Sequence, residues 1–418
     1  MSSVRQSSPT LLRLAARNLQ RNLRRTLITT AAISLGLALI VLTVNLNEGG
    51  YKRMMHSAIS AQAGHIVVQA VGYQADPDPL LLIDHAAEVV AKAEARFPEG
   101  TVAARSRLAG LITSPNNAVG AGVLAIVPSR EREITDLHTK LTEGAWLEDD
   151  DERGVILGAE LARRLGVTIG EKVVLMGQGK AEVTSRLLRL RGVVRTGSLE
   201  LDANIAVVTL GCAQAFLERP DSANQISVQL GSTEGTRALA AALADDLQRP
   251  DLEVLDWEQA LPEIVEFIQV DRTNNVVTMS IVGFIVAIGV LNTILMSVME
   301  RIREFGVLLA LGLRPSQIAS IIVMEGVLLG FGSSLIGLCI GIAISYPLVR
   351  WGFDAAAMMG GESMEVAGVM LDSRIFSAWA VPEMLTWTAA AWGMTILSTL
   401  WPARTAATLE PVDAMRHV

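Results

Sequence analysis

The chain has 418 residues, of which 50% are hydrophobic and only 19% are charged, with a formal net charge of −8. This composition is too apolar for an ordinary soluble enzyme of this size, so it predicts that apolar residues gather in segments that face lipid. The negative charge lies in residues 48–271, which carry a net −12 while the remainder carries +4. Such an acidic domain disfavours nucleic acid as a partner, and it either meets a cationic protein or is simply a solvated surface.

Residues 1–25 alternate leucines and arginines at helical spacing. Leu12, Ala16, Leu19 and Leu23 share one face, and Arg13, Arg17, Arg21 and Arg24 share the other. The pattern predicts a helix that lies on the cytoplasmic membrane surface, with its arginines among lipid phosphates. A basic leader that only sets the topology is the alternative. The apolar segment that follows is too long for the core of a cleaved signal peptide.

Four apolar segments each reach the roughly 20 residues that a helix needs to cross the hydrocarbon of a membrane. They are residues 26–47, 273–299, 316–349 and 384–403. Within the third, Glu325 is a lone acid, and we expect it to face other helices or the membrane boundary. The fold class is therefore an α-helical membrane protein with four transmembrane helices and a large extracytoplasmic domain between the first two.

Arginines fix the orientation of these spans. Six arginines and no acid precede the first span, arginines outnumber acids in residues 300–314, and the tail 404–418 contains Arg404 and Arg416. By contrast, five acids and two arginines lie in residues 350–383. Positively charged loops remain in the cytoplasm. We therefore expect both termini and residues 300–314 inside, and residues 48–271 and 350–383 outside.

The large domain, residues 48–271, has a mixed α/β pattern. Strands are expected at 65–70, 102–111, 225–230 and 252–255, with helices at 84–97 and 233–247, so that one lobe forms from both ends of the domain. The middle, about 123–223, reads as a β-rich insertion with strands at 155–157, 172–176 and 205–208 and a helix at 159–165 that ends before Gly166. Five consecutive acids, residues 148–152, lack the spacing of a calcium loop, which favours a solvated turn.

No catalytic centre is visible in the sequence. The stretch Gly177-Gln178-Gly179-Lys180-Ala181 lacks the first glycine and the final hydroxyl of a phosphate loop, so the chain does not hydrolyse ATP alone. The five histidines are scattered and form no metal site, and Cys212 and Cys339 fall in different parts of the topology. We expect no cofactor or metal bound directly to this chain.

The segment between the second and third spans contains a charged amphipathic helix. From Val298 to Leu311, Ile302, Phe305 and Leu309 share one face, after which Gly312 can end the helix and Pro315 can begin the next. A helix of this kind suits docking on a cytoplasmic partner, with the apolar residues in a groove of that partner and the charges at its rim. Taken alone, the same pattern is also that of an ordinary interfacial helix. The residues predicted to contact the partner are Glu300, Arg301, Ile302, Arg303, Glu304, Phe305, Gly306 and Leu309.

Small residues recur every four positions in the third span. Ser333, Gly337, Gly341 and Ser345 form a stripe that permits close helix packing, either within the chain or against a second chain.

These segments carry a family resemblance. Residues 292–325, NTILMSVMERIREFGVLLALGLRPSQIASIIVME, closely resemble the signature loop of the MacB/FtsX-type permease superfamily, which includes lipoprotein-releasing permeases. ARNLQRNLRRT before the first span and WPARTAATLEPVDAMRHV at the end resemble the same family. EGAWLEDDDERGVILGAELARRLGVTIGEKVVL resembles its periplasmic core domain.

The resemblance implies an ATP-driven transporter in the bacterial inner membrane. The loop would be the coupling helix that contacts a separate cytoplasmic ATPase, which binds the ATP and Mg, and the permease would pair with a second, identical or related permease. Membrane lipid and an extracytoplasmic acceptor or adaptor protein are the other partners implied.

The segment AQAGHIVVQAVGYQ after the first span is more similar to the lipoprotein-releasing (LolC/LolE-like) branch, which favours lipoprotein or lipid-like cargo. A MacB-like efflux permease for drugs or peptides, an FtsX-like regulator of an extracytoplasmic hydrolase and a membrane-anchored receptor are the alternatives. The length of residues 48–271 disfavours the regulator, and the coupling helix disfavours the receptor.

Overall fold

The computed structural model describes residues 17–18, 21, 23–178, 183–354, 365–366, 369–370 and 374–408. Most of the predicted surface helix at 1–25, the end of the tail after residue 408, and residues 179–181 of the phosphate-loop comparison lie outside this range. The chain forms two compact units. The helical unit comprises residues 1–52, 269–355 and 374–418, and the α/β unit comprises residues 53–268 and 356–373.

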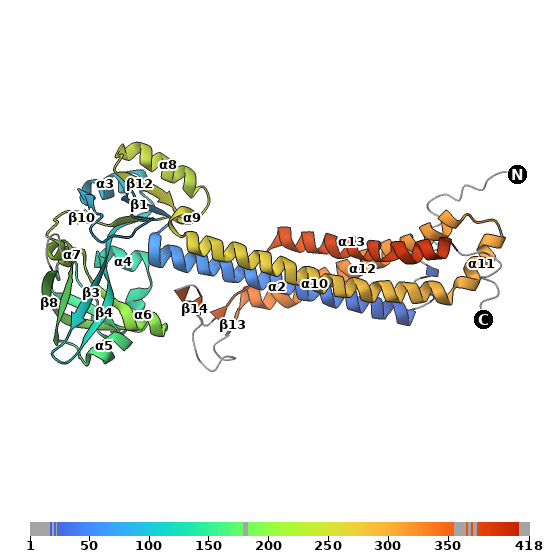
Figure 1. Cartoon of the computed structure of the whole chain (residues 1–418), viewed down its shortest axis with the longest axis horizontal. Coiled ribbons are helices and arrows are strands. Elements are labelled where there is room, and N and C mark those ends of the chain that lie inside the picture. Colours follow the sequence, from blue (N-terminus) through green and yellow to red (C-terminus); the bar gives the residue numbers. More distant parts are fainter. Residues whose placement is uncertain are drawn as a thin grey trace. The chain divides into compact units, whose positions relative to one another are not determined.

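Long helices build the helical unit (Figure 1). Its helices are α2 (Leu23–Ala58), α10 (Pro262–Glu300), α11 (Ile302–Ala310), α12 (Pro315–Arg350) and α13 (Val381–Ala407), and α2 and α10 continue into the α/β unit. Of the helices in the described residues, α2, α10 and α12 are long and apolar enough to cross a membrane. The fourth predicted span lies in α13, whose threonine, serine and tryptophan side chains make it less apolar, so the structure supports three spans by this measure. Short pairs β13 (Phe353–Asp354) with β16 (Arg374–Ile375) and β14 (Glu365–Val366) with β15 (Val369–Met370) lie between α12 and α13.

Small residues on α12 set its distance from two neighbouring helices. A Cβ at Gly337 would lie 2.8 Å from the Ser34 carbonyl oxygen of α2, and one at Gly341 would lie 2.7 Å from the Cβ of Val41. On another part of α12, a Cβ at Gly326 would overlap Thr399 of α13. The stripe of small residues therefore packs within the chain, which decides between the two arrangements that its spacing allowed.

The two serines at the ends of the stripe form hydrogen bonds with α2. Ser34 Oγ donates to the Ser333 carbonyl oxygen at 2.8 Å, and Asn45 Nδ2 donates to Ser345 Oγ at 3.2 Å. Asn45 is fully buried, and its Oδ1 accepts from the backbone N–H of Ala380 just before α13. One side chain thus ties α2 to α12 and to the start of α13, a role that residue type and spacing did not reveal.

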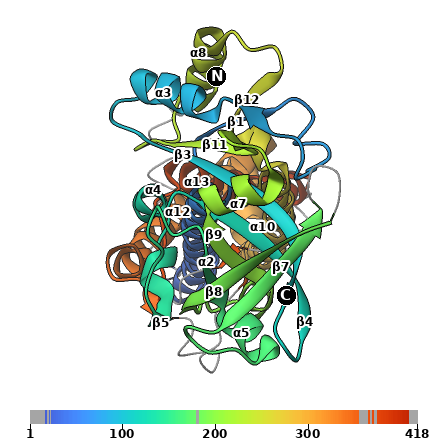
Figure 2. The same ribbon diagram turned by 90° about the vertical axis from the view of Figure 1, so that its left-hand side faces the viewer.

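A ten-stranded sheet in the order β12-β1-β11-β3-β4-β9-β6-β8-β5, with β7 beside β3 and β8, forms the α/β unit (Figure 2). Its strands are β1 (Ile66–Ala70), β3 (Thr101–Thr113), β4 (Ala118–Ile126), β5 (Leu141–Gly144), β6 (Gly154–Gly158), β7 (Lys172–Gln178), β8 (Val183–Val194), β9 (Ile205–Thr209), β11 (Gln225–Gln229) and β12 (Leu252–Asp256), and β2 (Ile83–Asp84) pairs separately with β10 (Ser222–Ala223). The helices are the π-helical η1 (Ile59–Ala63), α3 (Ala86–Arg96), α4 (Pro128–Ile134), the 3₁₀ helix η2 (Leu137–Lys140), α5 (Ala159–Leu165), α6 (Leu199–Asn204), α7 (Leu210–Leu217), α8 (Thr236–Leu247) and α9 (Trp257–Ala260).

Strand β3 belongs to both lobes of this unit. Its residues Thr101–Arg105 pair with β11, and Ser106–Thr113 pair with β4. One core lies between the first lobe and the helices α3 and α8, and a second core fills the lobe around β4, β6, β7, β8 and β9. The predicted start of the insertion near residue 123 is therefore too late, because β3 itself crosses into the second lobe at Ser106. Every strand and helix expected for this domain is present, and α5 ends at Gly166 with φ +68°, as its glycine predicted.

Candidate functional site

Helix α11 forms a short segment between the ends of α10 and α12. Helix α10 ends at Glu300, Arg301 leaves the helical conformation with φ −112° and ψ 11°, and α11 starts at Ile302. The predicted continuous helix from Val298 to Leu311 is therefore wrong at Arg301. The predicted ending is confirmed: Gly312 has φ +96°, and Pro315 occupies the first turn of α12.

The apolar face of α11 is buried against the chain's own helices. Phe305 is 1% exposed, and Ile302 and Gly306 are also buried. Phe305 packs in a cluster with Val298 of α10, Ile318 and Ile322 of α12, and Ala403 and Ala406 of α13. The expectation that Phe305 and Ile302 enter a groove of the partner is wrong for this structure. Periodicity identified the apolar face correctly, but it cannot say which surface covers that face.

A different face of α11 remains open. Leu311, directly after the helix, is 76% exposed, and Val307 is 45% exposed. Arg303 and Arg314 are exposed as well, whereas Leu309 is half-buried. The loop therefore combines a buried side that fixes its position with an exposed side of mixed apolar and basic character.

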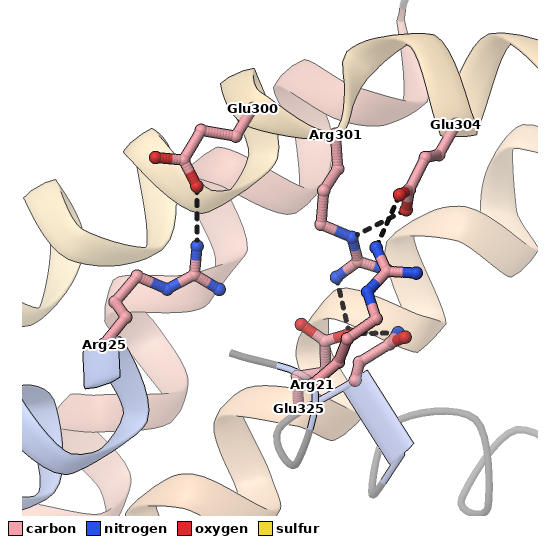
Figure 3. Close-up of polar contacts among 7 residues, drawn as sticks. Arg21, Arg25, Glu300, Arg301, Glu304 and Glu325 are labelled. Carbon is pink, nitrogen blue, oxygen red and sulfur yellow. Dashed lines mark hydrogen bonds and ion pairs between the residues drawn. The ribbon is translucent and has the colours of Figure 1, made fainter. Parts of the chain in front are cut away.

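Ion pairs bind the same loop to α2 and α12 (Figure 3). Arg301 donates from Nε to Glu304 at 3.2 Å and from Nη1 to Glu325 of α12 at 3.1 Å. Arg21, two residues before α2, pairs with Glu304, and Arg25 Nη1 donates to Glu300 at 3.2 Å. The contacts of Arg21, Glu304, Arg301 and Glu325 form one network that joins three segments far apart in the sequence, and Arg25–Glu300 is a separate pair.

Glu325 occupies the inner part of this network. Its side chain is 14% exposed and that of Arg301 is 10% exposed, and Asn18 Nδ2 also donates to Glu325 at 2.6 Å. Mutual pairing and an added hydrogen bond are what a charge needs in order to lie in an otherwise apolar helix. The Arg301 guanidinium also lies 5.1 Å from the centre of the Phe305 ring, which links the network to the apolar cluster.

The ionisation of Glu304 reflects its two arginine partners. Partial burial acts to raise the pKa of Glu304, but hydrogen bonds from Arg301 and Arg21 outweigh it and hold the pKa below its ordinary value of 4.5. The carboxylate of Glu304 is therefore charged at neutral pH.

At the end of the bundle nearer the C-terminus of α2, a second polar group joins α2 and α10. Tyr51 donates to Asp271 at 2.5 Å, Asn275 donates to Tyr51 at 3.0 Å, and Arg272 donates to Glu48 at 3.0 Å. These residues carry no motif in the sequence. In the sequence they are marked only by their position, as polar residues that border an apolar segment.

The α/β unit offers no metal centre in the part of the chain that the structure describes. In the acidic run, Asp151 pairs with Arg191, Glu152 pairs with Arg186, and Asp149 accepts from the backbone of Ser129. These acids serve as structural partners rather than as a free cluster of ligands.

Two family models match most of the chain. The model described as a MacB-like periplasmic core domain matches residues 26–246, and the FtsX-like permease C-terminal model matches residues 276–411. The chain belongs to the MacB/FtsX-type family of ABC transporter permeases. It is a membrane permease with a MacB-like periplasmic domain, and the family works with a cytoplasmic ATPase.

Named relatives of the permease cover nearly its whole length. A lipoprotein-releasing system transmembrane protein LolC from Neisseria meningitidis is 23% identical over 94% of both chains. A LolE protein from Haemophilus influenzae is 21% identical over 92% of this chain and 93% of its own. The macrolide export ATP-binding/permease protein MacB of Hyphomonas neptunium is 24% identical over 97% of this chain but only 60% of its own. The permease is thus a transport subunit and not an ATPase.

Proposed function

We propose that this permease couples a separate cytoplasmic ATPase to conformational change in its extracytoplasmic domain, and that it extracts lipoprotein or lipid-like cargo from the membrane. Relatives named as lipoprotein-releasing transmembrane proteins match almost end to end, which supports this cargo class. The MacB relative, by contrast, has a further 40% of its length outside the match, and its name includes ATP binding.

The observation that carries the proposal is the construction of α11. Its buried face is fixed by Phe305, and its charges join α2 and α12, while Val307, Leu311 and Arg303 stay exposed. A displacement imposed on the exposed side would therefore move the ends of several spans together. This is the property that a coupling helix requires, because packed and ion-paired elements shift as a unit. ATP and Mg bind the ATPase and not this chain.

The proposed setting is the bacterial inner membrane. Helix α13 serves as the fourth span beside α2, α10 and α12, and both termini are cytoplasmic, in line with the arginine distribution. A second permease subunit, identical or related, completes the membrane part. An extracytoplasmic acceptor or adaptor protein receives or guides the cargo.

A reconstituted complex tests this function. The permease and its ATPase are placed in liposomes with either an acylated lipoprotein or a macrolide, and ATP hydrolysis and release of the lipoprotein to a soluble acceptor are measured. The proposal predicts that lipoprotein raises ATP hydrolysis and leaves the liposome when ATP is present. Stimulation by the macrolide alone would instead support the MacB-like efflux function, and no stimulation by either would contradict the lipid-like cargo.

A further inference from the structure

One row of four residues crosses four neighbouring strands of the α/β unit. Glu253 of β12 pairs with Gln69 of β1, Gln69 pairs with Gln225 of β11, and Gln225 pairs with Arg105 of β3. Directly paired residues of antiparallel strands point to the same face, and this face is opposite to the one covered by α3 and α8 (Figure 2). Gln69 and Arg105 are 0% exposed and Gln225 is 6% exposed, so their hydrogen bonds must be satisfied inside the protein.

The direction of the hydrogen bonds along the row is fixed from its acidic end. An ionised carboxylate only accepts, and Gln69 Nε2 donates to Glu253 at 2.8 Å. Gln69 therefore turns its oxygen to Gln225, whose Nε2 donates to it at 3.5 Å. The Oε1 atom of Gln225 then needs a donor, and it is buried without a partner.

The basic end of the row has a matching donor. Arg105 gives Nε and Nη2 to Glu131 of α4 at 2.9 and 2.8 Å, and Nη2 also approaches the Ser60 carbonyl oxygen of η1 at 3.4 Å. Its remaining nitrogen, Nη1, is buried without a partner. The hydroxyl of Ser227, two residues beyond Gln225 on the same face, is likewise buried and unpartnered. Four of the six such side-chain atoms in the described residues thus lie on one sheet face: these three occupy neighbouring positions, and the fourth, Gln229 Oε1, lies two residues beyond Ser227.

We propose that one ordered internal water joins these three groups, accepting from Arg105 Nη1, donating to Gln225 Oε1 and bonding Ser227 Oγ. A buried water makes about three hydrogen bonds and can both donate and accept, which matches one nitrogen donor, one oxygen acceptor and one hydroxyl. An anion would be repelled by Gln225 Oε1, and a cation would be repelled by the guanidinium. Ser227 pairs with the small residue Ala103 on β3 and with Val67 on β1.

The water completes a hydrogen-bond chain from Glu253 to Glu131. One end, Glu253, lies on β12, which leads through α9 into α10. At the other end Glu131 accepts from Arg105, which also contacts η1, the continuation of α2. The site therefore links, inside the α/β unit, the two chain segments through which the long helices enter it. This role does not depend on the cargo.

A structure of the full complex of permease and ATPase at a resolution that shows ordered waters tests the site directly. Density is expected roughly 2.7 to 3.2 Å from Arg105 Nη1, Gln225 Oε1 and Ser227 Oγ. A direct hydrogen bond between Arg105 and Gln225, with no density beside Ser227, would overturn the proposal.

A double-mutant cycle gives a second test on the full chain. Gln225→Met and Ser227→Ala each remove one partner of the water, so each is expected to lower the unfolding temperature of the α/β unit. Because both act on one water, the double variant should lose clearly less than the sum of the two losses. Thr113→Val, in the other lobe, is the control and should add fully to Gln225→Met. Full additivity of Gln225→Met with Ser227→Ala would refute a shared water, and if these variants do not fold, the density measurement still decides.

Discussion

Phe305 and Leu311 lie six positions apart and should respond to truncation in opposite ways. Phe305 is 1% exposed in the cluster with Val298, Ile318 and Ile322, so Phe305→Ala leaves a cavity. Core Phe→Ala changes cost about 3 to 5 kcal/mol of unfolding free energy. Leu311 is 76% exposed and supports no core, so Leu311→Ala should change the stability of the isolated permease by less than about 0.5 kcal/mol.

For binding of the ATPase we expect the opposite, with Leu311 as the residue that makes the direct contact. If Leu311 is a contact residue, Leu311→Ala weakens ATPase association by about 1 to 3 kcal/mol, the range for an important interface residue, which is about 5- to 150-fold in Kd. The assays are thermal unfolding of the purified permease in detergent and titration with the ATPase. Arg303→Ala should weaken binding less, and its effect should shrink as salt rises. Normal stability of Phe305→Ala together with normal ATPase affinity of Leu311→Ala would refute this division of α11 into a packed face and a docking face.

Three further predictions concern the surrounding contacts. Glu325→Ala removes one carboxylate partner of Arg301 and should lower the unfolding free energy by about 1 to 3 kcal/mol. In a double-mutant cycle, the variant with both Glu325→Ala and Arg301→Ala should lose less than the sum of the losses of the two single variants. Because folding lowers the pKa of Glu304, the ionised side chain contributes fully to the free energy of unfolding above pH 4.5, and this contribution is lost as the pH falls below that value. The unfolding temperature of Glu304→Gln should therefore fall less steeply with pH in that range than that of the unchanged permease. An unchanged slope would contradict the pairing. Gly337→Ala should destabilise the bundle by about 1 to 3 kcal/mol through overpacking against α2. The control Gly332→Ala, whose added Cβ meets no atom within 4 Å, should be neutral or slightly stabilising. Equal effects of the two variants would disprove the close approach of α12 to α2 at Gly337.

Patterns within one element could be predicted from the sequence. The helix ending at Gly312 and the start at Pro315 were evident because both residues act through their own backbone. Strands and helices of the α/β unit followed from local periodicity in the same way. The amphipathic character of α11 was visible too, as Ile302 and Phe305 share its buried face.

Relations between distant segments could not be predicted. The burial of Phe305 under the chain's own helices depends on α13, about a hundred positions later. The pairing of Arg301 with Glu325 depends on α12, and the small-residue stripe finds its partner in Ser34 and Val41 of α2. Periodicity tells which residues leave water, but the covering surface is set by the three-dimensional arrangement.

Site-specific photocrosslinking in cells that contain the permease and its ATPase tests most directly whether the exposed side of α11 contacts the ATPase. A photoreactive residue is placed at Leu311, at buried Phe305, or at Leu39, which lies in the apolar part of α2 and is 55% exposed. We expect a crosslink to the ATPase from Leu311 and none from Phe305 or Leu39. A crosslink from Leu39, or the absence of one from Leu311, would contradict the claim that the exposed side of the loop between α10 and α12 couples this permease to its ATPase.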